Sequence, residues 1–126
     1  MSDEIGGNIP LIDHHCHGIM PGELSFEQFE DVISEAFAPA PAGTSHWDKP
    51  VAMSIRRWCA PMLDLPKFAS PQDYIARRAE LGGTEVNQRF MKAAKFEMLL
   101  VDSGNRPGEL CSVEEVGKIA GVPSRE

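Results

Sequence analysis

The sequence predicts an α/β fold from two strand-like runs and the helical patterns around them. Residues 9–17 and 96–102 are rich in apolar side chains and end in polar residues, which is typical of strands. The stretches between and after these runs repeat apolar side chains at helical spacing. Strands that alternate with helices pair in parallel, so we expect both runs in one sheet. Because about 80 residues separate them, against ~30 in a plain βαβ unit, we expect a helical insertion at about 25–95.

The length of the chain limits the number of domains. With 126 residues, of which 42% are hydrophobic, the chain suffices for one compact domain and is too short for two ordinary ones. We therefore predict a single partial domain over residues 1–126.

Charge, apolar runs and cysteines argue against several classes of protein. The net charge of −7 opposes a nucleic-acid surface, and no apolar run approaches the ~20 residues of a membrane span. The first residues lack the basic and apolar blocks of a secretory signal. Cys16, Cys59 and Cys111 are odd in number and widely spaced, so they cannot all pair within the chain. We expect reduced thiols, a cytoplasmic location, and neither nucleic acid nor a membrane as partner.

The first expected strand, 9–17, ends in Asp13-x-His15-x-His17. Successive side chains of a strand point to opposite faces. One face should therefore hold Leu11, Asp13, His15 and His17, and the other Ile12, His14 and Cys16. Two adjacent imidazoles at a strand end can bind one divalent ion. Asp13 is expected to orient a ligand histidine or to join the ligands, unless it binds the local backbone. Cys16 should be a buried, inert thiol, with a soft metal ligand or a nucleophile as the alternative.

Two helices are expected in the first half of the insertion. Ser25 and Gln28 form a capping-box pattern, and the helix that follows has an apolar face. That face comprises Phe26, Phe29, Ile33 and Phe37. Asp48 could cap a second helix over 49–59, which Pro61 should end. Its apolar side would carry Val51, Ile55 and Trp58, and we expect Trp58 to be a core residue.

Arg56 and Arg57 lie on this second expected helix. A guanidinium group can bind a substrate carboxylate through two hydrogen bonds, so both are candidate substrate-binding residues. The alternative is that they form salt bridges on an acidic protein.

The sequence predicts two more helices in the second half of the insertion. Ser70 followed by Pro71 starts one, which should end at Gly82 and Gly83. Thr84 is expected to cap the next helix, which contains Val86 and Phe90.

Asp102 ends the second expected strand, and a helix over 113–120 follows it. Asp102 is a candidate catalytic residue that would hydrogen-bond substrate, although an Asp before Ser-Gly also forms turns. Ser112 and Glu115 make a capping box for the helix. Residues 112–123 also resemble the start of a bacterial helix-turn-helix, which would need a recognition helix after the turn.

The Asp13-x-His15-x-His17 element resembles the opening motif of the amidohydrolase superfamily, and most closely the amidohydrolase-related family. Arg-Arg-Trp-Cys-Ala-Pro at 56–61 and Val-Asp-Ser-Gly at 101–104 fit the same layout. The resemblance implies the first two βα units of a TIM-barrel-like, metal-dependent hydrolase, with a helical insertion between strands 1 and 2. It also implies a metal site at the C-terminal mouth of the strands, with His15 and His17 as ligands.

The same resemblance implies a function and a cofactor. A divalent metal, with zinc as the expected ion, would activate a water that attacks a C–N bond of an amide or cyclic amide, or an ester bond. Relatives take further ligands from later strands, so we expect this chain to be the N-terminal part of such a hydrolase, inactive by itself. The alternative is a non-catalytic fragment or interaction module with a relict His-x-His site. The expected partner is a small-molecule substrate. The open sheet edges should be covered either by the chain's own helices or by a second copy in a homo-oligomer.

Overall fold

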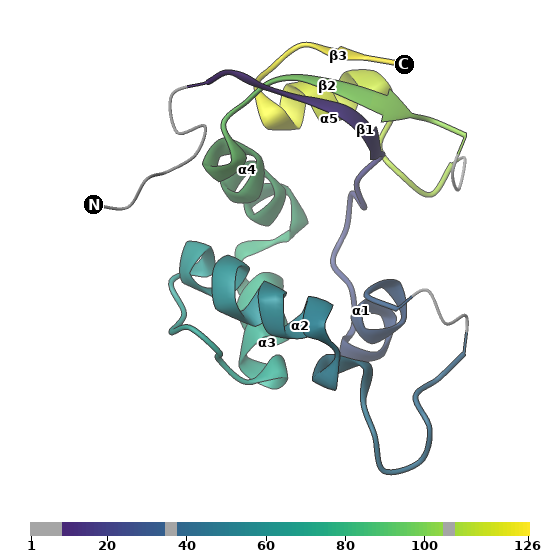
Figure 1. Ribbon diagram of the computed structural model, residues 1–126, viewed down its shortest axis with the longest axis vertical. Coiled ribbons are helices and arrows are strands. Elements are labelled where there is room, and N and C mark those ends of the chain that lie inside the picture. Colours follow the sequence, from purple (N-terminus) through teal and green to yellow (C-terminus); the bar gives the residue numbers. More distant parts are fainter. Residues whose placement is uncertain (1–8, 35–37, 105–107) are drawn as a thin grey trace. The chain divides into compact units, whose positions relative to one another are not determined.

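The computed structural model describes residues 9–34, 38–104 and 108–126 (Figure 1). The chain is mixed α/β with a small three-stranded parallel sheet, so the predicted fold class is confirmed at this level. It divides into two compact units, residues 1–21 with 87–126 and residues 22–86. We call them the sheet unit and the helical unit, and each is described by itself.

The sheet unit contains all three strands in the order β1-β2-β3 (Figure 1). β1 spans Leu11–His17 and β2 spans Phe96–Asp102, and the two pair in parallel. Sequence reasoning missed β3, Ser124–Arg125, which pairs in parallel with Leu99 and Leu100 of β2. Two residues are too few to show the alternation that predicts a strand.

The position of β3 contradicts the helix-turn-helix alternative. The helix α5, Val113–Ala120, begins with the predicted capping box of Ser112 and Glu115. It ends at Gly121, whose φ of 71° is the left-handed conformation that glycine adopts readily. The residues that would begin a recognition helix instead form a strand, because Leu99 N–H donates to the carbonyl of Pro123 and extends the ladder.

The core of the sheet unit lies on one face of the sheet. Leu99, Val101 and Val116 are its fully buried side chains. Around them pack Cys16, Ile19, Met91, Phe96, Cys111, Val113, Ala120 and Val122. Leu99 and Val101 are two apart on β2 and so share a face, which α5 covers. Asp102, the next residue, therefore belongs to the opposite face.

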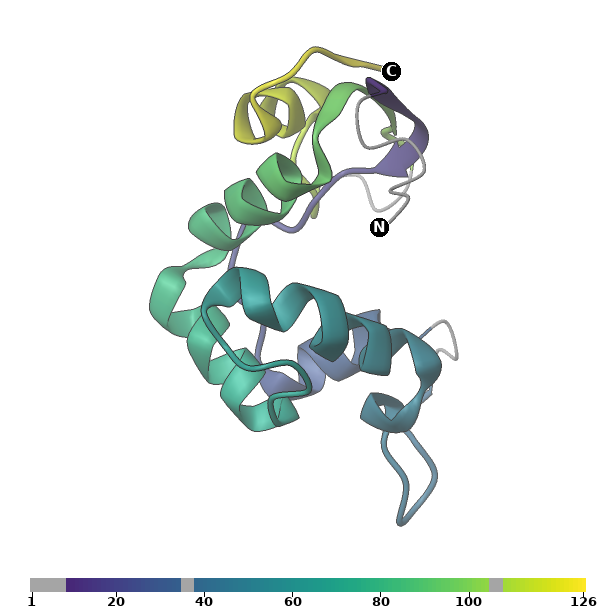
Figure 2. The ribbon, with the colours of Figure 1, turned by 60° about the vertical axis from the view of Figure 1, so that its left-hand side comes forward.

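The helical unit consists of short helices (Figure 2), and several of its aromatic rings pack against one another. Its elements are α1 (Phe26–Val32), η1 (His46–Asp48), α2 (Pro50–Ser54), η2 (Ile55–Cys59), η3 (Ala60–Leu63) and α3 (Pro71–Leu81). The predicted capping box of Ser25 and Gln28 starts α1, and Ser70 caps α3 as expected. Trp47 stacks on Phe29 at 5.3 Å between ring centroids, and both rings contact Tyr74 edge-on.

The second expected helix differs from its prediction in length and in its buried face. The helical path runs through α2, the π-helix η2 and the 3-10 helix η3, so Pro61 lies inside it and Asp64 ends it at a φ of 64°. A proline is tolerated near the start of a helical segment, where its missing N–H is not needed. The π turn also changes the spacing of side chains, and the buried residues are Ala52, Ala60 and Leu63. Trp58 is 62% exposed, which corrects its assignment to the core.

The fourth helix begins earlier than the sequence predicts. The fourth helix, α4, spans Gly83–Ala94, so Thr84 lies inside it rather than before it. Val86 N–H donates to the Gly82 carbonyl, which brings the start of the helix forward. Phe37 lies outside the described residues.

The buried phenol of Tyr74 predicts a loss of stability at high pH. Burial raises the pKa of Tyr74 from 10.0 to about 12, so the folded state holds this proton more tightly than the unfolded state. The resulting stability is fully present below pH 10 and is lost as the pH rises toward 12, by about 2 kcal/mol at pH 11.5. Urea unfolding at several pH values, followed by tryptophan fluorescence, should show this loss in the parent protein and not in Tyr74→Phe. Parallel pH profiles of the two proteins would contradict the assignment.

Candidate metal centre

The carboxyl ends of β1 and β2 lie side by side and bring three potential metal ligands together. The two strands run in parallel, and their register pairs His17 with Asp102. His15 is two residues before His17 on β1, so the two imidazoles share a face of the strand. Residues that are far apart in the sequence therefore meet at one edge of the sheet.

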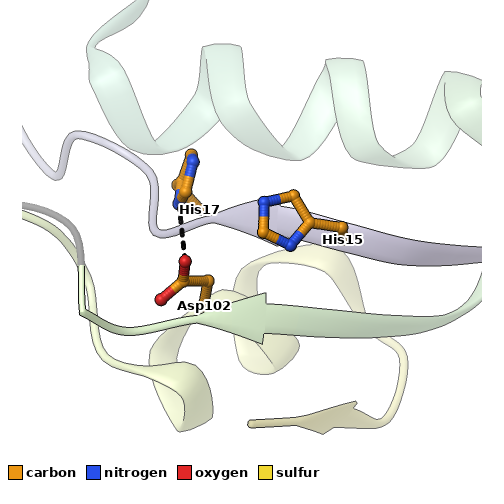
Figure 3. A group of neighbouring side chains, drawn as sticks. All are labelled: His15, His17 and Asp102. Carbon is orange, nitrogen blue, oxygen red and sulfur yellow. Dashed lines mark ion pairs between the residues drawn. The ribbon is translucent and has the colours of Figure 1, made fainter.

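The three side chains are close enough to hold one ion (Figure 3). One ligand atom from each of His15, His17 and Asp102 lies within 4.8 Å of the others. The imidazole rings of His15 and His17 are 5.1 Å apart between centroids and nearly perpendicular, at 81°. His17 Nδ1 lies 3.8 Å from Asp102 Oδ2. The side chains of His17 and Asp102 are 44% and 45% exposed, so an ion can reach the group from solvent.

The turn after β2 fixes the carboxylate of Asp102. Gly104 N–H donates to Asp102 Oδ1 at 2.9 Å, which leaves Oδ2 toward His17. A Cβ at residue 104 would lie 3.1 Å from Oδ1, so glycine allows this close approach. The turn-forming role and the site role of Asp102 are therefore compatible, because each uses a different oxygen.

The end of β1 is held by the segment before α5. Cys111 N–H donates to the Ile19 carbonyl at 2.9 Å. A Cβ at Gly18 would lie 2.6 Å from the Cys111 carbonyl oxygen, so only glycine fits between the two segments. This contact fixes the chain directly after His17.

Asp13 does not share the strand face of His15 and His17, although the alternation of side chains along β1 predicts that it should. The register pairs Asp13 with Leu99 and Cys16 with Val101, so β1 has one residue more than β2 over this interval. Such a bulge interrupts the alternation of faces, and Asp13 pairs with Leu99, a residue of the core face. Its Oδ1 accepts a hydrogen bond from His15 N–H at 3.2 Å. Asp13 thus binds the local backbone and is not part of the His15, His17 and Asp102 group.

The remaining polar residues of β1 are outside the group as well. Cys16 packs against the core, and its Sγ donates to the Leu100 carbonyl at 3.5 Å. Burial, and next the charge of Asp13, raise the pKa of Cys16, which disfavours the thiolate that a metal ligand or nucleophile requires. His14 is exposed and, unlike its two neighbouring histidines, is not among the grouped ligands.

The two candidate substrate-binding arginines belong to the helical unit, whereas the three grouped ligands belong to the sheet unit. Arg56 donates to the Ala69 and Phe68 carbonyls at 2.7 and 3.0 Å, so its guanidinium stabilises a turn of its own unit. Arg57 lies over the Trp58 ring, 4.9 Å from its centroid. Among the described residues, this pair makes hydrogen bonds to carbonyls and aromatic contacts, rather than the salt bridges of the alternative interpretation.

The donor set fits a divalent ion. Two imidazoles and one carboxylate are nitrogen and oxygen ligands that zinc accepts, and a catalytic zinc has three protein ligands and one open position. The same donors suit several other divalent ions, so they do not identify the metal. The sequence predicted His15 and His17 as ligands and left Asp13 as a possible third, whereas the third member of the group is Asp102. The third could have been found from the parallel order of the strands, which brings the end of 96–102 beside His17.

Comparison of the chain with models of protein families, with curated proteins and with solved structures finds no match. The resemblance of the Asp13-x-His15-x-His17 element to the amidohydrolase superfamily therefore stays a prediction. Among the residues that the structure describes, each helix is too short or too polar to cross a bilayer.

Substitution of any of the three grouped ligands should weaken metal binding. In His15→Ala, His17→Ala and Asp102→Asn, the dissociation constant for Zn²⁺ should rise by more than about tenfold, because even changes to residues around the ligands cost that much. Asp102→Asn keeps an oxygen for Gly104 N–H and removes the charge. Isothermal titration calorimetry on the parent protein and on each variant measures the effect.

The matched control for these variants is His14→Ala. It removes an exposed histidine from the same strand that does not belong to the group. The control should bind zinc like the parent protein. Equal losses in His14→Ala and His15→Ala would show that the ion binds the histidine-rich strand without a defined site.

Proposed function

We propose that this chain is the N-terminal part of a metal-dependent hydrolase that cleaves C–N bonds of amides or cyclic amides, or ester bonds. The observation that supports it is the group of His15, His17 and Asp102, in which one donor atom from each residue lies within 4.8 Å of the others. Three ligands from two adjacent strand ends give the number that catalytic zinc sites take from the protein.

Each residue has a distinct task in this proposal. His15 and His17 hold the ion through ring nitrogens, and Asp102 completes the set with Oδ2, which changes its role from substrate binding to metal binding. A divalent ion at this position would polarise a substrate carbonyl and lower the pKa of bound water to about 7. Gly104 N–H and the segment around Cys111 keep Asp102 and the end of β1 in place.

The order of the strands supports the barrel part of the proposal. β2, α5 and β3 form a parallel βαβ unit, and β1 pairs with the other edge of β2. Consecutive strands of a (β/α)8 barrel are neighbours in the same way, and its catalytic groups lie at the carboxyl ends of the strands. In this proposal the helical unit is the insertion between the first two strands, and the remaining strands lie outside these residues.

A non-catalytic metal-binding module is the second candidate. The exposure of the ligands favours it, since the side chains of His17 and Asp102 are nearly half exposed. Catalytic sites exclude bulk water around the reacting groups to strengthen electrostatic interactions. In the second candidate the ion would stabilise the pairing of β1 and β2 and would have no turnover.

Hydrolysis of an activated ester separates the two candidates. A p-nitrophenyl ester needs little more than an activated water. The sequence alone predicts a chain that is inactive by itself, because it offers too few ligands. Since Asp102 adds a third candidate ligand, we expect the zinc-loaded chain to hydrolyse this ester faster than the metal-free chain. The metal-dependent part of the rate should disappear in His15→Ala and His17→Ala and persist in His14→Ala. The release of p-nitrophenol is followed by absorbance, with zinc in buffer as the blank.

The outcomes of this experiment are distinct. Zinc binding that depends on His15 and His17, without any metal-dependent rate, would support the module and contradict the hydrolase. A rate that is equal in all four proteins would come from free zinc and would equally contradict it.

A further inference from the structure

The helical unit exposes two large aromatic rings around one guanidinium group. Trp58 and Phe68 are 62% and 48% exposed, whereas Trp47, the other tryptophan, is buried. The Arg57 guanidinium carbon lies 4.9 Å from the Trp58 ring centroid and 5.8 Å from that of Phe68. A cation at these distances is attracted to the faces of the rings. We call Arg57, Trp58 and Phe68 the arginine-aromatic patch.

The backbone of Phe68 is strained, and its ring is exposed. Its φ of 61° is the left-handed conformation, which is unfavourable for a bulky residue. Arg56 maintains this turn from both sides, since its carbonyl accepts from Phe68 N–H and its guanidinium donates to the Phe68 and Ala69 carbonyls. The guanidinium contacts of Arg56 thus support the turn that carries an exposed aromatic ring.

The other half of the patch also depends on an uncommon backbone. Arg57 and Trp58 belong to the π-helix η2, Ile55–Cys59. Such segments are rare in proteins and frequently occur at functional sites. A strained residue and a π-helix therefore converge on one exposed group of side chains.

The charge of the patch indicates the chemistry of its partner. Within the described residues Arg57 makes only aromatic contacts, and Lys67, beside Phe68, has no ion pair or hydrogen bond. The chain has 19 acidic against 12 basic residues, so acidic partners are abundant. Arg77, by comparison, pairs with both Asp64 and Glu80. The patch therefore offers positive charge that the other described residues leave available.

We propose that the arginine-aromatic patch is a docking surface for an acidic polypeptide segment that places apolar side chains beside its carboxylates. A carboxylate of the segment would bind the guanidinium of Arg57 while an apolar side chain packs on Trp58 or Phe68. Tryptophan and arginine are the residue types that contribute most to binding at protein interfaces. This inference concerns the helical unit and is independent of the proposed metal site.

A short synthetic peptide that alternates Glu with Leu tests the proposal on the full chain. Calorimetry should detect binding, and Arg57→Gln should weaken it by about tenfold, the loss expected for one charge-assisted hydrogen bond. Trp58→Ala should weaken it to a similar extent, because it removes the apolar surface on which the peptide packs. Arg125→Gln, which removes a guanidinium of the sheet unit, is the matched control and should leave affinity unchanged. Binding should also protect Trp58 from acrylamide quenching, while buried Trp47 contributes little change.

Two further measurements could contradict the proposal: binding of a peptide of opposite charge, and self-association of the chain. A peptide of the same pattern with Lys for Glu should not bind, and equal affinity for both peptides would overturn the role of Arg57. Sedimentation of the chain alone should not change in Trp58→Ala. A dimer that Trp58→Ala dissociates would assign the patch to a second copy of the chain and would overturn the proposal. Circular dichroism of each variant establishes that it is folded.

Discussion

The parallel pairing of β1 with β2 is the constraint on which the candidate site depends. Only this register, His17 beside Asp102, places a carboxylate from one strand end next to the two imidazoles of the other. The burial of Leu99, Val101 and Val116 on the opposite face stabilises the pairing. Since side chains alternate along a strand, the same burial directs Asp102 to the face that the core does not occupy. Packing and site geometry are therefore two results of one arrangement.

The sequence predicted elements well where local chemistry specifies them. The capping boxes of α1 and α5 and the Ser70-Pro71 start of α3 are short-range signals, and the structure confirms them. Trp58 and Asp13 show where such signals fail. A π-helix altered the spacing that should have buried Trp58, and a bulge removed Asp13 from the face of His15 and His17. A pattern of apolar residues read at regular helix or strand spacing does not reveal either irregularity.

The role of Asp102 could be predicted from the sequence only in part. Its place at a strand end was evident, and so was the prediction that the two strands pair in parallel. Its partnership with His17 required the register, which 80 or so intervening residues leave undetermined in the sequence. Arg56 and Arg57 were likewise correctly predicted to lie in a helical segment. Their roles nevertheless differ, because Arg56 holds a turn and Arg57 contacts aromatic rings.

The wide sequence separation of β1 and β2 has a consequence for how the molecule folds. Contacts between distant segments form late, because a long loop must close before they contribute. In an unfolded chain His15 and His17 are already neighbours, but Asp102 joins them only after the strands meet. An ion that prefers three ligands to two would therefore favour the folded state by mass action. Availability of metal would then govern how much of the sheet unit is assembled.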